Sequence, residues 1–194
     1  MRFSDRLMFL LLFLPVGASA DVGFDNFFFA YESAEAAGSG GDISGDTLVI
    51  RREFSPFSAF ALSGEYSNTR FERDIDQQTA ILQGLVYVPG DTFTLVFGAG
   101  WLATEIDAGS LDADEDGPVV SLEGRFRFSE KLGMLLGVDH VELDEASKTN
   151  IYRASLLLSD GETPLDIVFN YEISDTEGSS DTLESYGIGL RCNF

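Results

Sequence analysis

The C-terminal segment 183–194 alternates strictly between apolar and polar or small residues. One set of alternate positions is Tyr186, Ile188, Leu190, Cys192 and Phe194, and the other is Ser185, Gly187, Gly189, Arg191 and Asn193. A period of two is that of a β-strand, whose successive side chains point to opposite faces. Facing inward in a soluble sandwich, the arginine and the asparagine would be costly, whereas a membrane barrel turns apolar residues toward lipid and polar or small ones toward its lumen. The segment therefore favours a membrane barrel, and a soluble β-protein that ends in an alternating strand is the alternative.

This alternation, which ends on Phe194, resembles the closing strand of bacterial outer-membrane β-barrels. The resemblance implies that the outer-membrane assembly machinery recognises the C-terminal strand. It also implies a Gram-negative outer membrane as the location, with membrane lipid and lipopolysaccharide as neighbours. It rests on general patterning and the terminal phenylalanine, so it covers small and porin-like barrels alike and assigns no subfamily.

The N-terminus has the three parts of a secretory signal peptide. Arg2 and Arg6 precede the apolar run 7–17, and Ala18-Ser19-Ala20 is a small-residue cleavage motif. We predict cleavage after Ala20 and one mature domain, 21–194; an uncleaved signal anchor is the alternative. The run is shorter than the roughly 20 residues of a spanning helix, and no later segment reaches that length.

Composition narrows the classes of partner. The formal net charge is −21, and binding to nucleic-acid phosphates needs a basic surface, so nucleic acid is excluded as a partner. Divalent cations or a cation-rich surface fit this charge better. Cys192 is the single cysteine, so the chain cannot form an internal disulfide, and barrel closure must supply the stability.

Ten segments have strand character, and they predict an all-β fold, a transmembrane up-and-down antiparallel β-barrel. The segments are 22–32, 47–54, 57–67, 78–88, 92–104, 119–128, 132–143, 151–158, 165–173 and 183–194. Eight strands is the alternative, because the first two segments alternate weakly. The connections fall into a short set, 55–56, 89–91, 129–131 and 159–162, and a longer, mostly acidic set, 33–46, 68–77, 105–117, 144–148 and 174–181. Short periplasmic turns and longer outer loops are typical of bacterial barrels.

The faces opposite the apolar rows carry the ionisable residues. These inward positions are Arg51, Glu53, Glu65, Glu123, Arg125, Arg127, Asp139, Arg153, Asp166, Glu172 and Arg191. Charges confined in a narrow tube must be paired, and arginine suits multidentate pairing with carboxylates. We therefore predict a plugged lumen with at most a narrow pore for small solutes. Arg52 is a misfit that points toward lipid, unless it snorkels or a bulge shifts the register.

An acidic segment matches the sequence pattern of an EF-hand calcium loop. The pattern runs from Asp112 through Asp114, Asp116 and Gly117 to Glu123. An EF-hand needs flanking helices, whereas the following residues are predicted as a strand. The remaining hypothesis is that Asp112, Asp114 and Asp116 hold Ca²⁺ or Mg²⁺ at the outer rim, near the ions that bridge lipopolysaccharide phosphates.

His140 is the single histidine and lies beside Asp139. Neighbouring residues of a strand point to opposite faces, so Asp139 cannot orient His140 as a general base, and an interfacial histidine is the prediction. We expect a non-enzymatic barrel with a structural or surface-interaction role. The alternatives are an outer-membrane lipid A or peptide hydrolase centred on His140, and a soluble exported calycin-like binding barrel.

Overall fold

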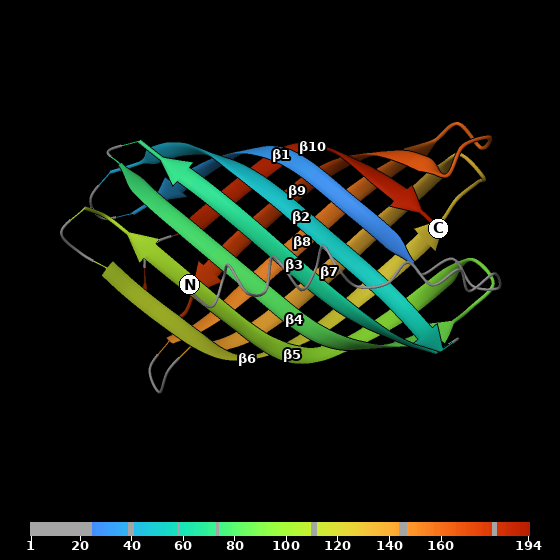
Figure 1. The fold of residues 1–194 in the computed structure, drawn as a ribbon, viewed down its shortest axis with the longest axis horizontal. Coiled ribbons are helices and arrows are strands. Elements are labelled where there is room, and N and C mark those ends of the chain that lie inside the picture. Colours follow the sequence, from blue (N-terminus) through green and yellow to red (C-terminus); the bar gives the residue numbers. More distant parts are fainter. Residues whose placement is uncertain are drawn as a thin grey trace.

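A computed structural model describes residues 25–38, 41–57, 59–72, 74–109, 112–143, 147–179 and 182–194. Its strands are β1 (Asn26–Ala37), β2 (Ile43–Phe57), β3 (Phe60–Phe71), β4 (Ile75–Pro89), β5 (Phe93–Asp107), β6 (Asp112–Arg127), β7 (Leu132–Leu143), β8 (Ser147–Ser159), β9 (Leu165–Thr176) and β10 (Thr182–Asn193). Each strand pairs with its sequence neighbours, and β1 pairs with β10 to close the barrel (Figure 1). The ten-stranded up-and-down prediction is confirmed, and the eight-stranded alternative is wrong.

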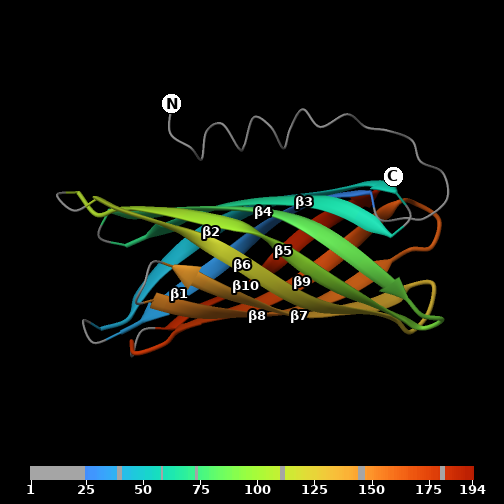
Figure 2. The same ribbon diagram turned by 90° about the horizontal axis from the view of Figure 1, so that it is seen from below.

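Closure joins the two ends of the described chain. β1 and β10 are antiparallel from Asn26↔Asn193 to Ala37↔Thr182, and the Phe194 N–H donates to the Asp25 carbonyl at 2.9 Å. Because every strand has two neighbours, no edge is left unpaired, as a lipid environment requires. In Figure 2, β3 and β4 lie on the side of the barrel opposite β7 and β8. We call the end with Asp25 and Phe194 the terminal end and the opposite end the distal end.

The predicted difference in loop length is wrong. The distal connections are 38–42, 72–74, 108–111, 144–146 and 177–181, and the terminal connections are 58–59, 90–92, 128–131 and 160–164. The strands continue into the segments predicted as long distal loops, as when Asp107 pairs with Asp112 at the end of β5 and β6. Backbone pairing needs no apolar side chains, so a polar, acidic stretch can remain strand after its hydrophobic alternation has ended.

The barrel wall is apolar on its outer face and polar on its inner face. Phe97, Phe169 and Ile188 are 47%, 44% and 52% exposed, whereas Glu53 and Asp139 are 5% and 4% exposed. A water-soluble barrel would place these two groups the other way round, because apolar side chains gain by leaving water. The soluble calycin-like alternative is therefore wrong for this fold.

The turn between β2 and β3 lies later than predicted. β2 continues through Pro56 to Phe57, and its register with β3 shifts between Phe54 and Phe57. A bulge accommodates a proline, which has no N–H to donate to the ladder. Arg52 precedes the shift and pairs with Phe27 near the terminal end, so it stays on the outward face and the bulge does not move it.

The terminal turn between β8 and β9 is held by Asp160. Its carboxylate accepts hydrogen bonds from the Thr163 N–H at 2.8 Å and the Glu162 N–H at 2.9 Å. These two backbone donors, with the Thr163 hydroxyl and the charge of Lys131, lower the pKa of Asp160 because they stabilise its ionised form.

The predicted signal peptide lies within residues 1–24, outside the described part of the chain. Among the described residues, no helix is long and apolar enough to cross a membrane.

Gly100 in β5 tests how closely neighbouring strands approach. A Cβ at Gly100 would lie 1.9 Å from the Leu82 carbonyl oxygen, whereas a Cβ at Gly137 would meet nothing closer than 3.7 Å. We expect Gly100→Ala to lower the free energy of unfolding by about 1–3 kcal/mol, because the backbone of β4 has to shift. Gly137→Ala is the matched control, and we expect a change below about 0.5 kcal/mol. Urea titration of the barrel in lipid vesicles measures both, and equal losses would contradict the close approach.

Candidate functional site: a charged belt and a cavity inside the barrel

A ring of paired charges crosses the middle of the lumen. We call it the central belt, and it consists of Arg51, Glu53, Glu65, Glu123, Arg125, Asp139, Arg153 and Glu172. The residues come from six strands, and each occupies an inward position of its strand because side chains alternate across the wall. The belt therefore ties together strands that are not hydrogen-bonded neighbours.

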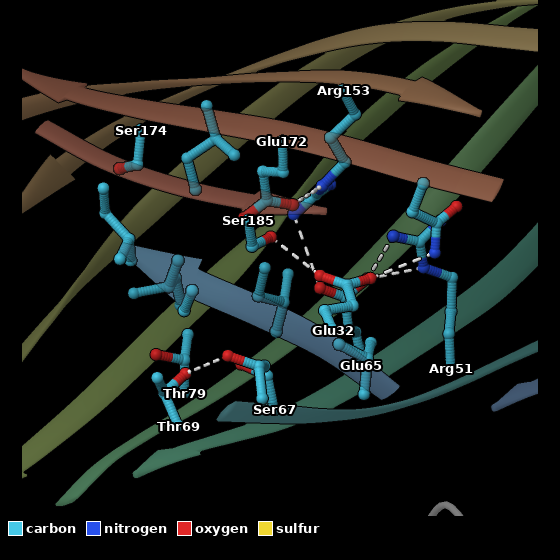
Figure 3. Close-up of a pocket in the computed structure, with 18 of the residues that line it drawn as sticks. Glu32, Arg51, Glu65, Ser67, Thr69, Thr79, Arg153, Glu172, Ser174 and Ser185 are labelled. Atoms are coloured by element: carbon cyan, nitrogen blue, oxygen red, sulfur yellow. Dashed lines mark hydrogen bonds and ion pairs between the residues drawn. The ribbon is translucent and has the colours of Figure 1, made fainter. Parts of the chain in front are cut away.

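Arg153 of β8 joins three carboxylates. Its guanidinium forms ion pairs with Asp139 of β7, with Glu172 of β9 at 2.7 Å and with Glu65 of β3 at 3.4 Å. The pair with Glu65 spans the lumen, since β3 and β8 lie on opposite sides of the barrel. Figure 3 shows Arg153 beside Glu172, with Glu65 and Arg51 further along the same row of charges.

Arg125 of β6 forms a second pair across the lumen. Its Nη1 and Nη2 donate to the two carboxylate oxygens of Glu53 on β2 at 3.0 and 2.6 Å, and its Nε donates to Glu123 at 2.5 Å. The guanidinium also lies over the ring of Tyr87, 5.3 Å from its centroid. This bidentate geometry is the strong form of an arginine–carboxylate contact.

Arg51 of β2 completes the belt. Its Nε and Nη2 both lie 2.5 Å from Glu65 Oε2, and its guanidinium lies 5.8 Å from the ring centroid of Phe28. Glu65 thus contacts Arg51 and Arg153 together. Such shared contacts compensate carboxylates that the barrel wall shields from water.

The remaining predicted lumen charges lie near the terminal end. Arg191 of β10 pairs with Asp166 of β9 at 2.5 Å, and Asn193 donates to the same carboxylate at 3.0 Å. Arg127 is the last residue of β6 and is exposed, and the structure does not bring it into the belt. Arg127 lies on the same face of β6 as Arg125, as predicted, but β6 ends at Arg127 and its side chain is exposed.

A cavity of about 280 Å³ runs along the lumen, from Asn26 and Arg191 near the terminal end, past the central belt, to the distal half of the barrel. Three threonine pairs from adjacent strands line it: Thr47 with Thr69 at 2.8 Å, Thr79 with Thr104 at 3.0 Å, and Thr149 with Thr176 at 2.9 Å. Each hydroxyl thereby has a partner across a strand pair. Glu32 of β1 also lines the cavity and accepts a hydrogen bond from Ser185 (Figure 3). A second hydrogen bond to Glu32 comes from Asn170.

A second cavity, of about 30 Å³, lies among the belt residues. Gln83 lines it, and its buried side-chain nitrogen has no hydrogen-bond partner among the described atoms. The cavity has room for about two water molecules, each of which needs roughly 10–15 Å³ by this measure. This second space within the belt is therefore large enough for isolated waters only.

The acidic segment of the EF-hand pattern is part of a strand. Asp112, Asp114 and Asp116 occupy alternate positions of β6, and Trp101 Nε1 donates to Asp116 at 2.7 Å. An EF-hand loop must curl around its ion, whereas an extended strand spaces alternate residues by about 6.6 Å. No group of three metal-binding side chains occurs among the described residues. Because the Asp112 side chain is not among them, a divalent cation at the rim stays a prediction.

His140 faces outward on β7, away from Asp139. Its Nδ1 lies 2.9 Å from the Asn150 side-chain oxygen, and its Nε2 lies 3.9 Å from Glu142. Asp139 points into the lumen, where it binds Arg153. The wall of the barrel thus separates the histidine from the carboxylate next to it in sequence.

Sequence reasoning missed Glu32 and the six paired threonines. Glu32 follows a run with aromatic residues on both faces. Thr69 and Thr176 lie in segments predicted as loops, and Thr149 lies between a predicted loop and the next predicted strand. The alternation of the strands could have placed them. Thr69, Thr149 and Thr176 each lie an even number of positions from a predicted inward residue of the same strand, so they point to the same face.

Two solved structures share the fold over nearly the whole chain. The translocator domain of the autotransporter NalP from Neisseria meningitidis is 10% identical, with 98% of this chain and 96% of that chain covered and a TM-score of 0.56. An outer-membrane channel from Pseudomonas putida F1 is 9% identical, with 93% and 100% covered and a TM-score of 0.56. The chain has the fold of a small outer-membrane β-barrel. No protein-family profile and no curated protein sequence matches it.

A substitution of Arg153 measures how much the central belt contributes to the free energy of unfolding. We expect Arg153→Gln to lower the free energy of unfolding by about 3–5 kcal/mol, because it leaves three enclosed carboxylates without their shared cation. Arg70→Gln is the control: Arg70 and Asp76 are 78% and 52% exposed and 3.7 Å apart, so its loss should cost less than about 1 kcal/mol. Urea unfolding in lipid vesicles compares the two. Similar values would show that the belt contributes no more than a surface pair.

Proposed function

We propose that this protein is an integral outer-membrane β-barrel with a non-enzymatic, structural or surface-interaction role, and that the central belt closes its lumen to all but small solutes. The polarity of the wall is the single observation that carries the proposal. Large apolar side chains cover its outside while its charges are paired inside. Only a hydrocarbon surrounding makes that arrangement favourable.

The dimensions of the strands support a membrane location. The strands are 12 to 16 residues long, and a tilted strand needs roughly 9–11 residues to span the hydrocarbon. The surplus lies at the distal end, where acidic residues such as Asp107 and Asp114 occur within strands. We assign this end to the cell exterior and the terminal end to the periplasm. Acidic side chains are then outside the hydrocarbon.

The closing strand and the rim supply the proposed partners. β10 ends beside Phe194, which is 56% exposed, so the apolar face of this strand is available to the outer-membrane assembly machinery. The acidic distal rim would meet lipopolysaccharide through bridging divalent cations. Asp114 and Asp116, with Asp112, are the candidates to hold such ions.

The placement of His140 supports the non-enzymatic role. A hydrolase needs its base oriented by a neighbouring group and aimed at a substrate site. His140 faces the surroundings beside Asn150 and Glu142, and the cavity lies on the other side of the wall. The carboxylates of the central belt are held by arginines, so they do not form an acid and base pair.

Membrane insertion has a direct test. We expect the protein to fractionate with outer membranes, to require detergent for extraction, and to migrate faster on a gel before boiling than after it. The difference in migration arises because a closed barrel stays compact until heat breaks its ladder. Recovery of the protein in the soluble periplasmic fraction would contradict the proposal.

The closed lumen has an electrical test. We expect the wild-type barrel to show no large stable conductance in planar lipid bilayers, because Arg125 and Glu53 bridge the lumen. The double variant Glu53→Ala and Arg125→Ala removes both partners of this bridge, and we expect its single-channel conductance to rise several-fold. Arg70→Ala is the control at an exposed pair and should leave the conductance unchanged. Large, stable channels in the wild type would overturn the closed lumen.

A further inference from the structure

The distal part of the larger cavity has an aliphatic wall. Its apolar lining includes Ile81, Leu102, Val141, Leu143 and Ile151, which belong to one packed cluster. These residues come from β4, β5, β7 and β8, the strands across the barrel from β1 in the strand order. A lumen that only conducted water or small ions would gain nothing from an aliphatic surface of this kind.

Glu32 faces the same cavity from β1. It is 6% exposed, and its carboxylate oxygens accept hydrogen bonds from Ser185 Oγ at 2.7 Å and from Asn170 Nδ2 at 3.0 Å. Among the described residues it forms no ion pair, unlike the five carboxylates of the central belt. A buried carboxylate held by two neutral donors is oriented but not neutralised.

The charge balance around the cavity is negative. The belt contains three arginines and five carboxylates. Outside the belt, Glu32 and Glu115 add two carboxylates to the lining, and Arg191, which is paired with Asp166, adds one arginine. Glu65 and Glu172 act on Glu32 as like charges. A cation in the cavity would offset this repulsion, and the low dielectric of an enclosed site would strengthen the attraction.

We propose that this cavity binds a small organic cation, with its ammonium group on Glu32 and its apolar body against the aliphatic wall. A bare metal ion would find carboxylate oxygen on one side and hydrocarbon on the other, whereas a primary ammonium compound matches both surfaces. The volume of about 280 Å³ is roughly twice that of a cavity known to hold benzene. A ligand of about ten non-hydrogen atoms therefore fits.

The acidic distal end is suited to attract such a ligand. Glu115 lines the cavity, and Asp107 and Asp114 lie at the distal ends of the neighbouring strands. A surface of one sign raises the local concentration of the opposite charge and accelerates its association. This binding activity goes beyond the proposed structural role and does not require an open path through the belt.

The test uses 2-phenylethylammonium as the probe. It is titrated by calorimetry into the full-length folded barrel in a zwitterionic detergent, with empty micelles as the blank. We expect saturable binding of one equivalent, no binding of 3-phenylpropanoate, and much weaker binding of inorganic ammonium. The gel shift on boiling checks each sample for folding, so a failure of the barrel itself is recognised separately.

Three variants locate the binding site. Glu32→Gln keeps the shape of the side chain: its oxygen can still accept from Asn170, and its amide nitrogen can donate to the Ser185 hydroxyl. We expect at least a tenfold loss of affinity, about 1.4 kcal/mol. Glu35→Gln removes the same charge from an exposed position on β1 and should leave the affinity unchanged. Ile151→Thr makes the aliphatic wall more polar and should weaken 2-phenylethylammonium several-fold but leave methylammonium unaffected.

The outcomes separate the proposal from its competitors. Absence of saturable binding to the folded barrel would overturn it, as would unchanged affinity in Glu32→Gln. Equal losses in Glu32→Gln and Glu35→Gln would also overturn it, because they would show a diffuse attraction to the acidic surface. Binding of the anion with similar affinity would exclude Glu32 as the recognising group.

Discussion

The closed backbone ladder is the constraint on which the rest of this structure depends. Once β1 pairs with β10, every residue of every strand belongs to one of two environments, and parity alone decides which. Phe97 and Gly98 are neighbours in sequence, yet one contacts the surroundings and the other approaches Ser121 inside the lumen. A single slip in register would exchange these environments along a whole strand. The bulge at Phe54 to Phe57 therefore occurs at a strand end, where few residues follow it.

Charged side chains enclosed by such a wall lose much of their hydration, which is unfavourable. In the central belt this loss is offset because side chains of opposite charge share partners. Arg153 and Glu65 each contact more than one opposite charge, and Arg125 reaches across the lumen to Glu53. Pairs of this kind are weak evidence for added stability relative to an apolar core, but removing one member is costly. The belt is better understood as a device that fixes the cross-section of the barrel. Its ion pairs connect strands that are not hydrogen-bonded neighbours, such as β3 with β8 and β2 with β6.

Most of the fold followed from alternation, because the outward rows are strongly apolar. The segments around Phe97, Phe169 and Ile188 needed no tertiary information to be assigned as strands. Alternation alone left open which face points outward, and the ionisable residues opposite the apolar rows favoured the membrane sense. The inward positions of Arg125 and Arg153 followed from the same parity. What the sequence could not show was how far the strands extend and which charges meet. Segment 105–117 is polar on both faces, so its pairing depends on neighbours already aligned by the rest of the barrel, and the contact of Arg153 with Glu65 depends on closure.

In the proposed orientation, the extended strands at the distal end form the surface that faces the exterior of the cell. Paired strands hold their side chains at fixed heights and spacings, whereas long loops would sample many shapes. The pairing of Asp107 with Asp112 is one example of two acidic residues held side by side at the distal end. An antibody elicited by the folded barrel would then recognise a surface assembled from several strands. A synthetic peptide copied from residues 105–117 would reproduce the sequence of that surface without its architecture.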